Sequence, residues 1–410
     1  MSDPFRFEYH PAALRFGTGV AGDLAAELDA HGFERALVVC GETVGNTPAV
    51  IDPVTEGLGD RLAGVFAETT PKKRLSTAFD AVAAARERDA DVLVGLGGGS
   101  SLDVAKIASL LWADDREPAA VGRELADSGT ITVPPGELLP VVAVPTTLAG
   151  ADLSMVAGVT PGRERGLVEE TVGGGVGDRR LMPASVVADP ELVATTPESV
   201  LSASAMNGFD KGIETLYAAT ATPVTDATAS HGLGRLADGL IDLGESGPDP
   251  ATLEPVVEGL LLVQYGISRP GVTTLSLIHA FGHGLTRTAD LQQGAAHAVI
   301  APHALSYLFE EVDGRRELLA GALGVGDAAD SAAALGVDDA ADPAEAVVER
   351  VEAVRDALGL PSRLRDLSGP EPDEFEAIAE AVLADSFTPN APEGLDPTVE
   401  ELVAVLEAAY

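Results

Sequence analysis

A glycine-rich turn is the part of the sequence whose residue types point most directly to a ligand. The turn Gly97–Ser100 follows an apolar stretch, residues 91–96, and precedes a segment with helical spacing that starts at Ser101. Glycines let a phosphate approach the backbone, and the N–H groups and dipole of the helix N-terminus attract its negative charge. The pattern predicts a pyrophosphate site, although a glycine turn also occurs where the backbone merely needs a positive φ.

Two charged residues of the following helix have a functional and a structural interpretation. We expect Asp103 and Lys106 to lie near the bound phosphate. In the structural interpretation Asp103 caps the helix with Ser100, and Lys106 is a solvated helix residue.

Histidines supply the second candidate chemistry. His279 and His283 are four residues apart, so both lie on one face of a helix. The structural alternative is two satisfied core histidines. His297 and His303 are weaker candidates, and His10, His31 and His231 have no motif around them.

Two differently patterned halves must position these residues. Strand-like runs at 35–41, 90–99 and 138–147 alternate with helical stretches such as 76–88, which predicts a parallel sheet buried on both faces. After about Pro190 the pattern becomes helical, at 198–219, 252–267, 274–285 and 297–309 and in the acidic, alanine-rich tail from about 325, with loops near 243–249 and 369–372. We predict an α/β domain over residues 1–188 and an all-helical domain over 189–410.

Composition limits the partners of the chain. Its 410 residues include 65 acidic and 26 basic ones, a net charge of −39, which disfavours nucleic acid and anionic membranes. Only Lys72, Lys73, Lys106 and Lys211 are lysines, and an acidic surface poor in lysine suits concentrated salt, so we expect a halophilic protein. Cys40 is the only cysteine, and no signal peptide or spanning segment is evident, so we expect a cytoplasmic protein.

Motifs in a fixed order resemble one family. The segment 97–106, GGGSSLDVAK, is similar to the GGGSxxDxAK signature of iron-containing alcohol dehydrogenases. The same order holds for the early FGxG element at Phe16–Gly19, the PTT turn at Pro145–Thr147, the DPxL boundary at Asp189–Leu192, the helix Met206–Glu214, the HAxxH helix at His279–His283 and the block Gln293–His303. The form of residues 145–154, PTTLAGADLS, is nearer to that of maleylacetate reductases within this superfamily.

The resemblance implies a fold and a set of cofactor contacts. The first half would be a Rossmann-like dinucleotide-binding domain and the second an all-helical domain, together a dehydroquinate synthase-like fold with the cofactor and substrate in the cleft between the two. The cofactor-binding residues would be Gly41, Gly97, Gly98, Gly99, Ser100, Asp103, Lys106, Thr146, Thr147 and Leu153.

The resemblance also locates a metal site whose ligands are largely replaced. Metal-binding members use one aspartate and three histidines, and these fall on Asn207, Lys211, His279 and Gln293. An ammonium does not coordinate a metal, and amides are weak neutral ligands, so we expect no tightly bound metal. A register slipped by three residues would instead offer Asp210 and Glu214 as ligands.

Lys211 provides a substitute for the missing ion. Its fixed charge would hydrogen-bond the carbonyl oxygen of a substrate and stabilise the alkoxide formed by hydride transfer, and with a lowered pKa it could donate the proton. The structural alternative is a surface lysine within the motif. The resemblance adds His279 as a proton carrier on the substrate side and His283 as a neighbour of the cofactor, so the expected catalytic residues are Lys211, His279 and His283.

These residues predict an NAD(P)-dependent oxidoreductase acting on a small alcohol or carbonyl compound. An acid at the end of the second strand would favour NAD, and here that place falls on Gly41, so we favour NADP(H), with NAD(H) open because Glu42 follows. We expect a homodimer. The alternatives are a non-redox lyase of the dehydroquinate synthase type and a degenerate homologue that only binds nucleotide.

Overall fold

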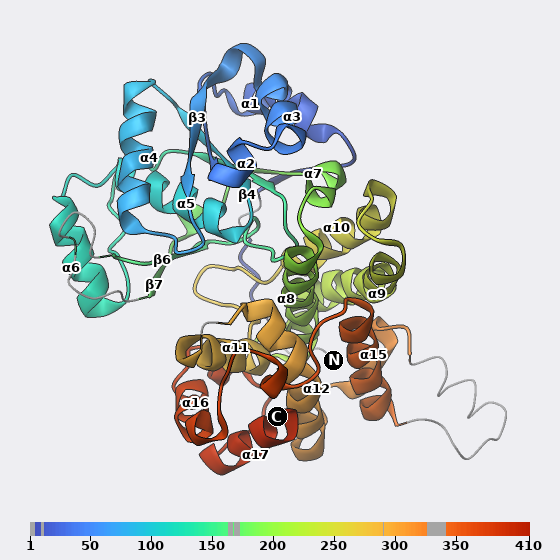
Figure 1. Ribbon diagram of the computed structural model, residues 1–410. Coiled ribbons are helices and arrows are strands. Elements are labelled where there is room, and N and C mark those ends of the chain that lie inside the picture. The colour runs from blue at the N-terminus through green and yellow to red at the C-terminus, as the bar shows by residue number, and fades with distance from the viewer. Residues whose placement is uncertain (1–4, 10–11, 163–166, 168–172, 290, 326–341) are drawn as a thin grey trace. The chain divides into compact units, whose positions relative to one another are not determined.

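The computed structural model describes residues 5–9, 12–162, 167, 173–289, 291–325 and 342–410 (Figure 1). The chain forms two compact units. The N-terminal unit runs from Tyr9 to Thr196, and the C-terminal unit comprises Pro197–Tyr410 with the described residues before Tyr9. The division thus falls at 196/197, where the sequence suggested 188/189.

The N-terminal unit alternates strands and helices. Its strands are β1 (Ala13–Phe16), β2 (Ala36–Gly41), β3 (Leu62–Thr69), β4 (Val92–Gly97), β5 (Val141–Pro145), β6 (Val156–Val159), β7 (Gly174–Gly177) and β8 (Ser185–Ala188). Its helices are α1 (Leu24–His31), α2 (Glu42–Gly45), α3 (Pro48–Leu58), α4 (Leu75–Glu87), α5 (Gly99–Trp112), α6 (Pro118–Ser128) and α7 (Pro190–Ala194).

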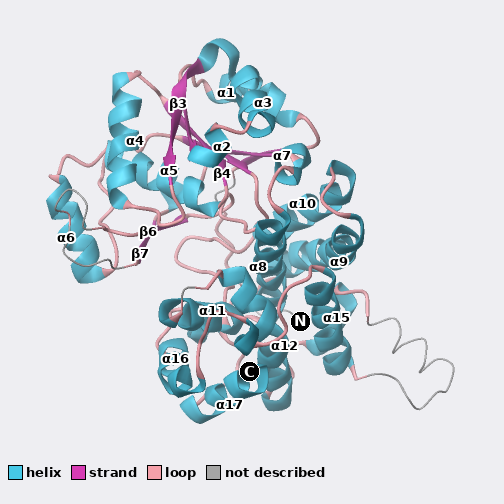
Figure 2. Cartoon of the chain, in the orientation of Figure 1, coloured by secondary structure: helices cyan, strands magenta, loops and turns pink. Residues whose placement is uncertain are grey.

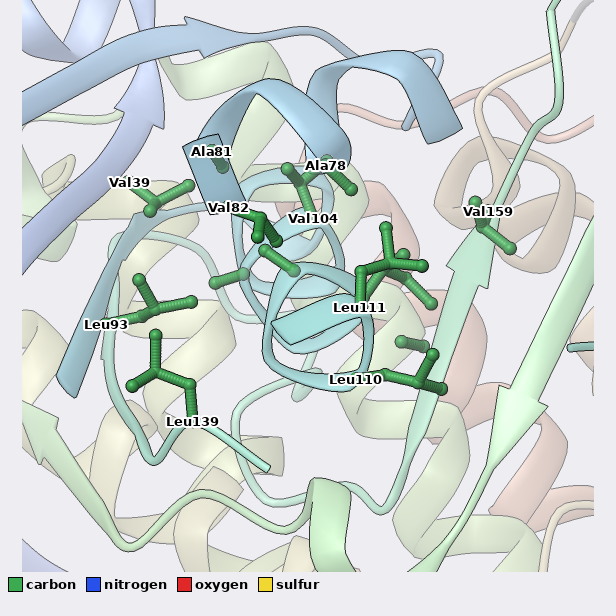
Figure 3. Packing of buried hydrophobic residues seen from close by; sticks show 14 of the residues in the cluster. Val39, Ala78, Ala81, Val82, Leu93, Val104, Leu110, Leu111, Leu139 and Val159 are labelled. Atoms are coloured by element: carbon green, nitrogen blue, oxygen red, sulfur yellow. The ribbon is translucent and has the colours of Figure 1, made fainter. Parts of the chain in front are cut away.

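Six of these strands form one parallel sheet in the order β1-β8-β5-β4-β2-β3, which confirms the predicted parallel sheet. Alternate residues of β2 enter two separate cores: Val38 packs with α1 and α3, and Val39 packs with α4 and α5. Figure 3 shows the second core around Val39, Leu93 and Val104. Burial of each such side chain contributes roughly 1.5–3 kcal/mol, so the sheet is a rigid base for the turns at its edge.

Several elements of this unit were not predicted from the sequence. Strand β3 lies at one edge of the sheet, where Val65 is exposed. Its sequence, LAGVFAET, is interrupted by Gly64 and carries a weaker strand signal than the buried strands. Strands β6 and β7 pair as a separate antiparallel hairpin, and the GGVG sequence of β7 carries little strand signal.

The C-terminal unit consists of helices and loops in its described part, as the absence of magenta arrows among these elements in Figure 2 shows. The helices are α8 (Glu198–Tyr217), α9 (Pro223–Ser246), α10 (Pro250–Gln264), α11 (Leu277–Thr288), α12 (Gln293–Glu311), α13 (Arg316–Ala322), α15 (Pro343–Ala357), α16 (Phe375–Leu383) and α17 (Val399–Ala409). The all-helical prediction is confirmed for these residues, whereas part of the tail from about 325, residues 326–341, lies outside them.

The loop predicted near 243–249 is wrong in extent. Helix α9 continues to Ser246, and Asp249 already caps α10 by accepting from the N–H groups of Ala251 and Thr252. Gly244 lies inside α9, where it packs against the backbone of Ala357. The connection between α9 and α10 is therefore shorter than its glycines suggested. No helix among the described residues is long and apolar enough to cross a membrane.

Candidate functional site

The glycine turn lies at the carboxyl end of β4, directly before α5. Gly97 has a φ of 129°, which a side chain rarely adopts, and its carbonyl accepts from the N–H of Thr146. A side chain at Gly98 would lie 3.1 Å from Thr147 Cγ2, and one at Gly99 would lie 3.4 Å from Ala151. The loop after β5 therefore packs closely against the turn and leaves little room for side chains, while Gly98, Gly99 and Ser100 stay partly exposed. In the first turn of α5 the N–H groups of Ser101 and Leu102 donate to the Gly98 carbonyl. Those of Gly99 and Ser100 precede this bonding and have no acceptor within the helix, which suits an anion.

Gly41 lies at the same edge of the sheet. It ends β2, pairs with Thr69 of β3 and is followed by the exposed Glu42. The hydroxyl of Thr69 lies 2.7 Å from that of Ser101, so the end of β3 is tied to the first turn of α5. Because β2 and β4 pair in parallel, Gly41 and the glycine turn lie at the same edge of the sheet.

Lys106 is not a solvated residue, and that structural interpretation is wrong. Its side chain is fully buried, and Nζ donates to the carbonyls of Ala151 and Ser154, both at 2.7 Å, and to that of Val156 at 3.4 Å. Burial lowers the pKa of Lys106 to about 8, although the carboxylates of Asp103 and Asp152 oppose this shift. Lys106 therefore holds the 151–156 loop, and its ammonium is already committed to backbone oxygens.

Asp103 has a partner that the sequence did not suggest. Its Oδ2 accepts from Lys73 Nζ at 2.6 Å, and α5 is capped by Gly98 without a side-chain bond, so the capping interpretation is wrong. Of the other expected cofactor residues, Thr146 is buried and its carbonyl accepts from the Thr196 hydroxyl at 2.5 Å. Leu153 is also buried, at 5% exposure, whereas Ser100 is partly exposed.

The C-terminal unit gathers histidines and carboxylates in its interior. His279 Nδ1 lies 2.6 Å from Glu214 Oε2, and the backbone N–H of His279 donates to Oε1 of the same carboxylate at 2.9 Å. The ring of His297 packs against His279, with centroids 4.5 Å apart, and its Nδ1 is 3.3 Å from Asp210 Oδ2 without hydrogen-bond geometry. The four residues come from three helices and lie up to 87 residues apart in the sequence, from Asp210 to His297, which explains why the sequence did not assemble them.

Burial sets the charge states of this cluster. Burial raises the pKa of Glu214 to about 7, although the backbone N–H groups of His279 and Ser276 donate to the carboxylate and favour its ionised form. Burial also raises the pKa of Asp210 well above its ordinary value. Burial likewise lowers the pKa of His279 well below its ordinary value and that of His297 to about 3. Both histidines therefore stay neutral at physiological pH. His279 Nε2 is buried and makes no hydrogen bond among the described residues, so it faces inward as an open acceptor.

Close helix packing makes this arrangement possible. A side chain at Gly282 of α11 would lie 2.2 Å from His297 Nε2, so only glycine leaves room for that ring. A side chain at Gly294 would lie 1.7 Å from the carbonyl of Ala203, so the start of α12 packs directly on α8. This contact places Gln293, the first residue of α12, next to the level of Ala203 on α8. The buried Asn207 follows one helical turn later on α8.

Lys211 and His283 complete the group of predicted catalytic residues. Lys211 is half-buried on α8, and its charge is among the causes that lower the pKa values of both His279 and His297, so it lies near both rings. His283 Nδ1 lies 3.0 Å from Asp385 Oδ2. The structure thus brings Lys211, His279 and His283 together with His297, whereas His303 lies near Glu352 and Arg355.

The residues at the metal-ligand positions do not fit a divalent ion. Asn207, Lys211 and Gln293 offer two amides and an ammonium, and only His279 offers a good ligand atom. Of the two carboxylates of the slipped register, Glu214 is committed to His279 and to the Tyr217 hydroxyl, whereas the buried oxygens of Asp210 have no hydrogen-bond partner among the described residues. Across the described residues, no group of three or more histidine, cysteine or acidic side chains is arranged to hold a metal.

Comparison with known proteins identifies the family. Residues 11–190 match the model of the iron-containing alcohol dehydrogenases, and residues 202–410 match that of the C-terminal domain of the same family. Maleylacetate reductase of Pseudomonas aeruginosa is 28% identical over 406 residues, which are 99% of this chain and 97% of that protein. Maleylacetate reductase of Burkholderia cepacia is 30% identical over 327 residues, 79% of this chain and 81% of that protein.

The fold agrees with this assignment. The crystal structure of maleylacetate reductase from Agrobacterium tumefaciens superposes with a TM-score of 0.76 at 24% identity, covering 100% of this chain and 99% of that one. The chain therefore belongs to the iron-containing alcohol dehydrogenase family. It is an NAD(P)-dependent oxidoreductase of the alcohol dehydrogenase and reductase type.

Proposed function

We propose that the protein reduces a small carbonyl substrate with a nicotinamide cofactor and without a catalytic metal, with Lys211 in the place of the metal charge. The observation that carries the proposal is that Lys211, a half-buried cation on α8, lies close enough to the neutral His279 and His297 for its charge to lower their pKa values. Two of the other metal-ligand positions hold amides, Asn207 and Gln293. A cation there stabilises the oxyanion that hydride transfer leaves on the substrate oxygen.

The histidines divide the remaining work. His279 is neutral, and with Nδ1 bonded to Glu214 its Nε2 accepts a hydrogen bond from a substrate group. Its burial makes it a poor proton carrier, since the charged form is strongly disfavoured. His283 is partly open to solvent, with a side chain 32% exposed, so we assign the proton delivery to His283.

The glycine turn Gly97–Ser100 is our proposed pyrophosphate site, supported by its position at the N-terminus of α5 and by the partial exposure of Gly98, Gly99 and Ser100. For NADP(H) over NAD(H), the supporting features are Gly41 and the turn after β3. Thr69 pairs with Gly41, and the exposed Lys72 follows Thr69 by three residues, so a lysine lies at the edge where a 2′-phosphate would need a cation.

The substrate class is proposed from the relatives. Because two of them are maleylacetate reductases, maleylacetate is the first compound to test, followed by small aldehydes and ketones. Absorbance at 340 nm in the presence of NADPH and chelator should fall with substrate. A non-redox lyase of the dehydroquinate synthase type and a degenerate nucleotide-binding homologue would both leave it constant, and constancy with all of these compounds would overturn the proposal.

The cofactor preference has its own test. Changing Lys72 to Met should weaken NADPH binding about tenfold, which corresponds to about 1.4 kcal/mol, and leave NADH binding unchanged. Equal effects on both cofactors would contradict the assignment of Lys72. The homodimer, the cytoplasmic location and the halophilic origin stay predictions.

A further inference from the structure

Asp385 is a buried carboxylate that belongs to no motif recognised in the sequence. It lies two residues after the end of α16, and its side chain is 2% exposed. Its Oδ1 accepts from the N–H of Phe387 at 3.0 Å, and its Oδ2 lies 3.0 Å from His283 Nδ1 and 3.3 Å from Arg287 Nη2. All of these partners lie in the C-terminal unit, so the arrangement is defined within one compact body.

The position of Asp385 is fixed by packing as well as by hydrogen bonds. Helices α11 and α16 cross closely, because a side chain at Gly284 would lie 3.1–3.2 Å from Val382 and Ile378. The ring of Phe387 lies against that of His283, with centroids 5.2 Å apart. The His283 ring is therefore held on one side by an aromatic ring and at Nδ1 by a carboxylate.

The carboxylate remains ionised despite its burial. Burial alone would raise the pKa of Asp385, but the hydrogen bonds from His283 and from the Phe387 N–H, with the charge of Arg287, lower it below its ordinary value. An ionised carboxylate only accepts hydrogen bonds, so Nδ1 of His283 must carry a hydrogen. The neutral ring then has its lone pair on Nε2, and a proton taken up by the ring is released from Nε2.

We propose that Asp385 is the positioning residue of the proton-delivering histidine: it fixes the His283 tautomer and stabilises the imidazolium. The proposal rests on the function proposed above. A hydride carries two electrons from NAD(P)H to the substrate carbon, the cofactor leaves as NAD(P)⁺, and the oxyanion takes one proton from His283 Nε2. Solvent water then reprotonates the ring, which its partial exposure permits.

The other charged groups around His283 make Asp385 its main anionic partner. Lys211 on α8 is cationic, and so is Arg287, which lies on α11 together with His283. The buried His279 and His297 are neutral. Glu214 is already bonded to His279. Without Asp385, an imidazolium at His283 would face cations and neutral rings among the described residues, so its charge would lose its main anionic partner.

The test compares Asp385→Asn with the wild-type enzyme. An amide at this position is nearly isosteric, but it removes the charge and can also donate to Nδ1, which permits the opposite tautomer. We expect turnover to fall about tenfold to hundredfold, within the ~10²–10⁴-fold that general acid catalysis supplies. We also expect the alkaline limb of the pH profile of reduction to move to lower pH, with NADPH affinity unchanged.

Asp226→Asn is the matched control. It removes the carboxylate of another ion pair in the same unit, that with Arg315, and so lowers stability away from His283. If loss of Asp385 acts only by loosening the fold, both variants will lower the unfolding temperature and neither will move the pH limb. That outcome would overturn the proposal even if turnover fell.

A measurement that needs no activity separates this proposal from the function. Nitrogen-15 NMR of histidine-labelled protein, assigned with His283→Gln, reports which ring nitrogen of His283 carries the hydrogen. The wild type should show Nδ1–H, and Asp385→Asn should show a mixture or the Nε2–H form. An Nε2–H ring in the wild type refutes the role of Asp385. A wild type that shows Nδ1–H but consumes no NADPH with any carbonyl substrate refutes the proposed function alone.

Discussion

Lys106 allows a prediction whose size follows from its hydrogen bonds. Changing Lys106 to Met preserves length but removes both short bonds to the carbonyls of Ala151 and Ser154. A buried carbonyl left without a donor costs about 1–3 kcal/mol, so the two together cost roughly 2–6 kcal/mol. The change also relieves the burial of an ammonium, worth about 3 kcal/mol because burial lowers its pKa from 10.5 to about 8.

The cost of the two lost hydrogen bonds and the gain from no longer burying an ammonium nearly cancel in the stability of the whole fold. The 151–156 loop has no such compensation. We expect the free energy of unfolding to fall by at most about 3 kcal/mol near pH 7, because the cost exceeds the relief only modestly. The 151–156 loop loses its anchor, and since Ala151 packs on Gly99, NAD(P)H affinity should fall about tenfold, or about 1.4 kcal/mol.

Calorimetric titration with NADPH and with ADP distinguishes this mechanism from direct phosphate binding. The 151–156 loop also carries Leu153, an expected cofactor contact outside the glycine turn. If Lys106 acts mainly through that contact, ADP binding should weaken much less than NADPH binding. Lys73→Met is the control. It removes a half-exposed lysine that is paired with Asp103, a residue on the same helix as Lys106. Equal losses for ADP and NADPH would show that Lys106 contacts phosphate, and unchanged affinity and stability would refute the reasoning altogether.

The same lysine predicts a pH dependence of stability. Its pKa is lower in the folded protein than in the unfolded chain, so between about 8 and 10.5 the unfolded chain binds a proton that the folded protein has released. Raising the pH across this window therefore favours the folded wild type. The difference in unfolding free energy between the wild type and Lys106→Met should grow from pH 8 to pH 10.5, and a constant difference would contradict the assigned shift.

Three further predictions concern the cofactor turn, the salt response and the metal. Gly98→Val should abolish nucleotide binding, because its side chain would meet Thr147 and cover the turn, whereas Gly22→Ala, which meets nothing within 4 Å, should bind normally in the same titration. The unfolding temperature should rise between dilute buffer and molar KCl, because salt screens a net charge of −39, and equal temperatures would count against a halophilic protein. Elemental analysis of purified protein should find far less than one equivalent of iron or zinc, and chelators should not inhibit it; one equivalent bound at His279 would contradict the account.

Local pattern was sufficient for the elements that carry the cofactor turn. The apolar runs of β2, β4 and β5 and the turn before α5 were all predicted close to their observed bounds, because strands buried on both faces need such runs. The same reasoning missed β3 and β7, where Gly64 and the glycines of GGVG weaken the strand signal.

Side-chain partners were harder to predict than elements. The structural interpretations of Lys106 and Asp103, a solvated residue and a helix cap, considered only local partners, whereas the observed partners, the 151–156 loop and Lys73, are 30 or more residues away. Asp385 is 102 residues from His283, and only the packing of α16 on α11 brings them together. Glu214 carried one signal that could have been used, since it is an acid in the apolar end of α8.

The central claim, a lysine acting in place of a metal, is tested most directly by the rate of hydride transfer in Lys211→Met. Single-turnover oxidation of bound NADPH by the substrate, measured with chelator present, should slow by about a hundredfold, or roughly 3 kcal/mol. NADPH affinity should change little, and Arg123→Gln, which removes an exposed cation of α6, should leave the rate unchanged. An undiminished rate in Lys211→Met would contradict the claim.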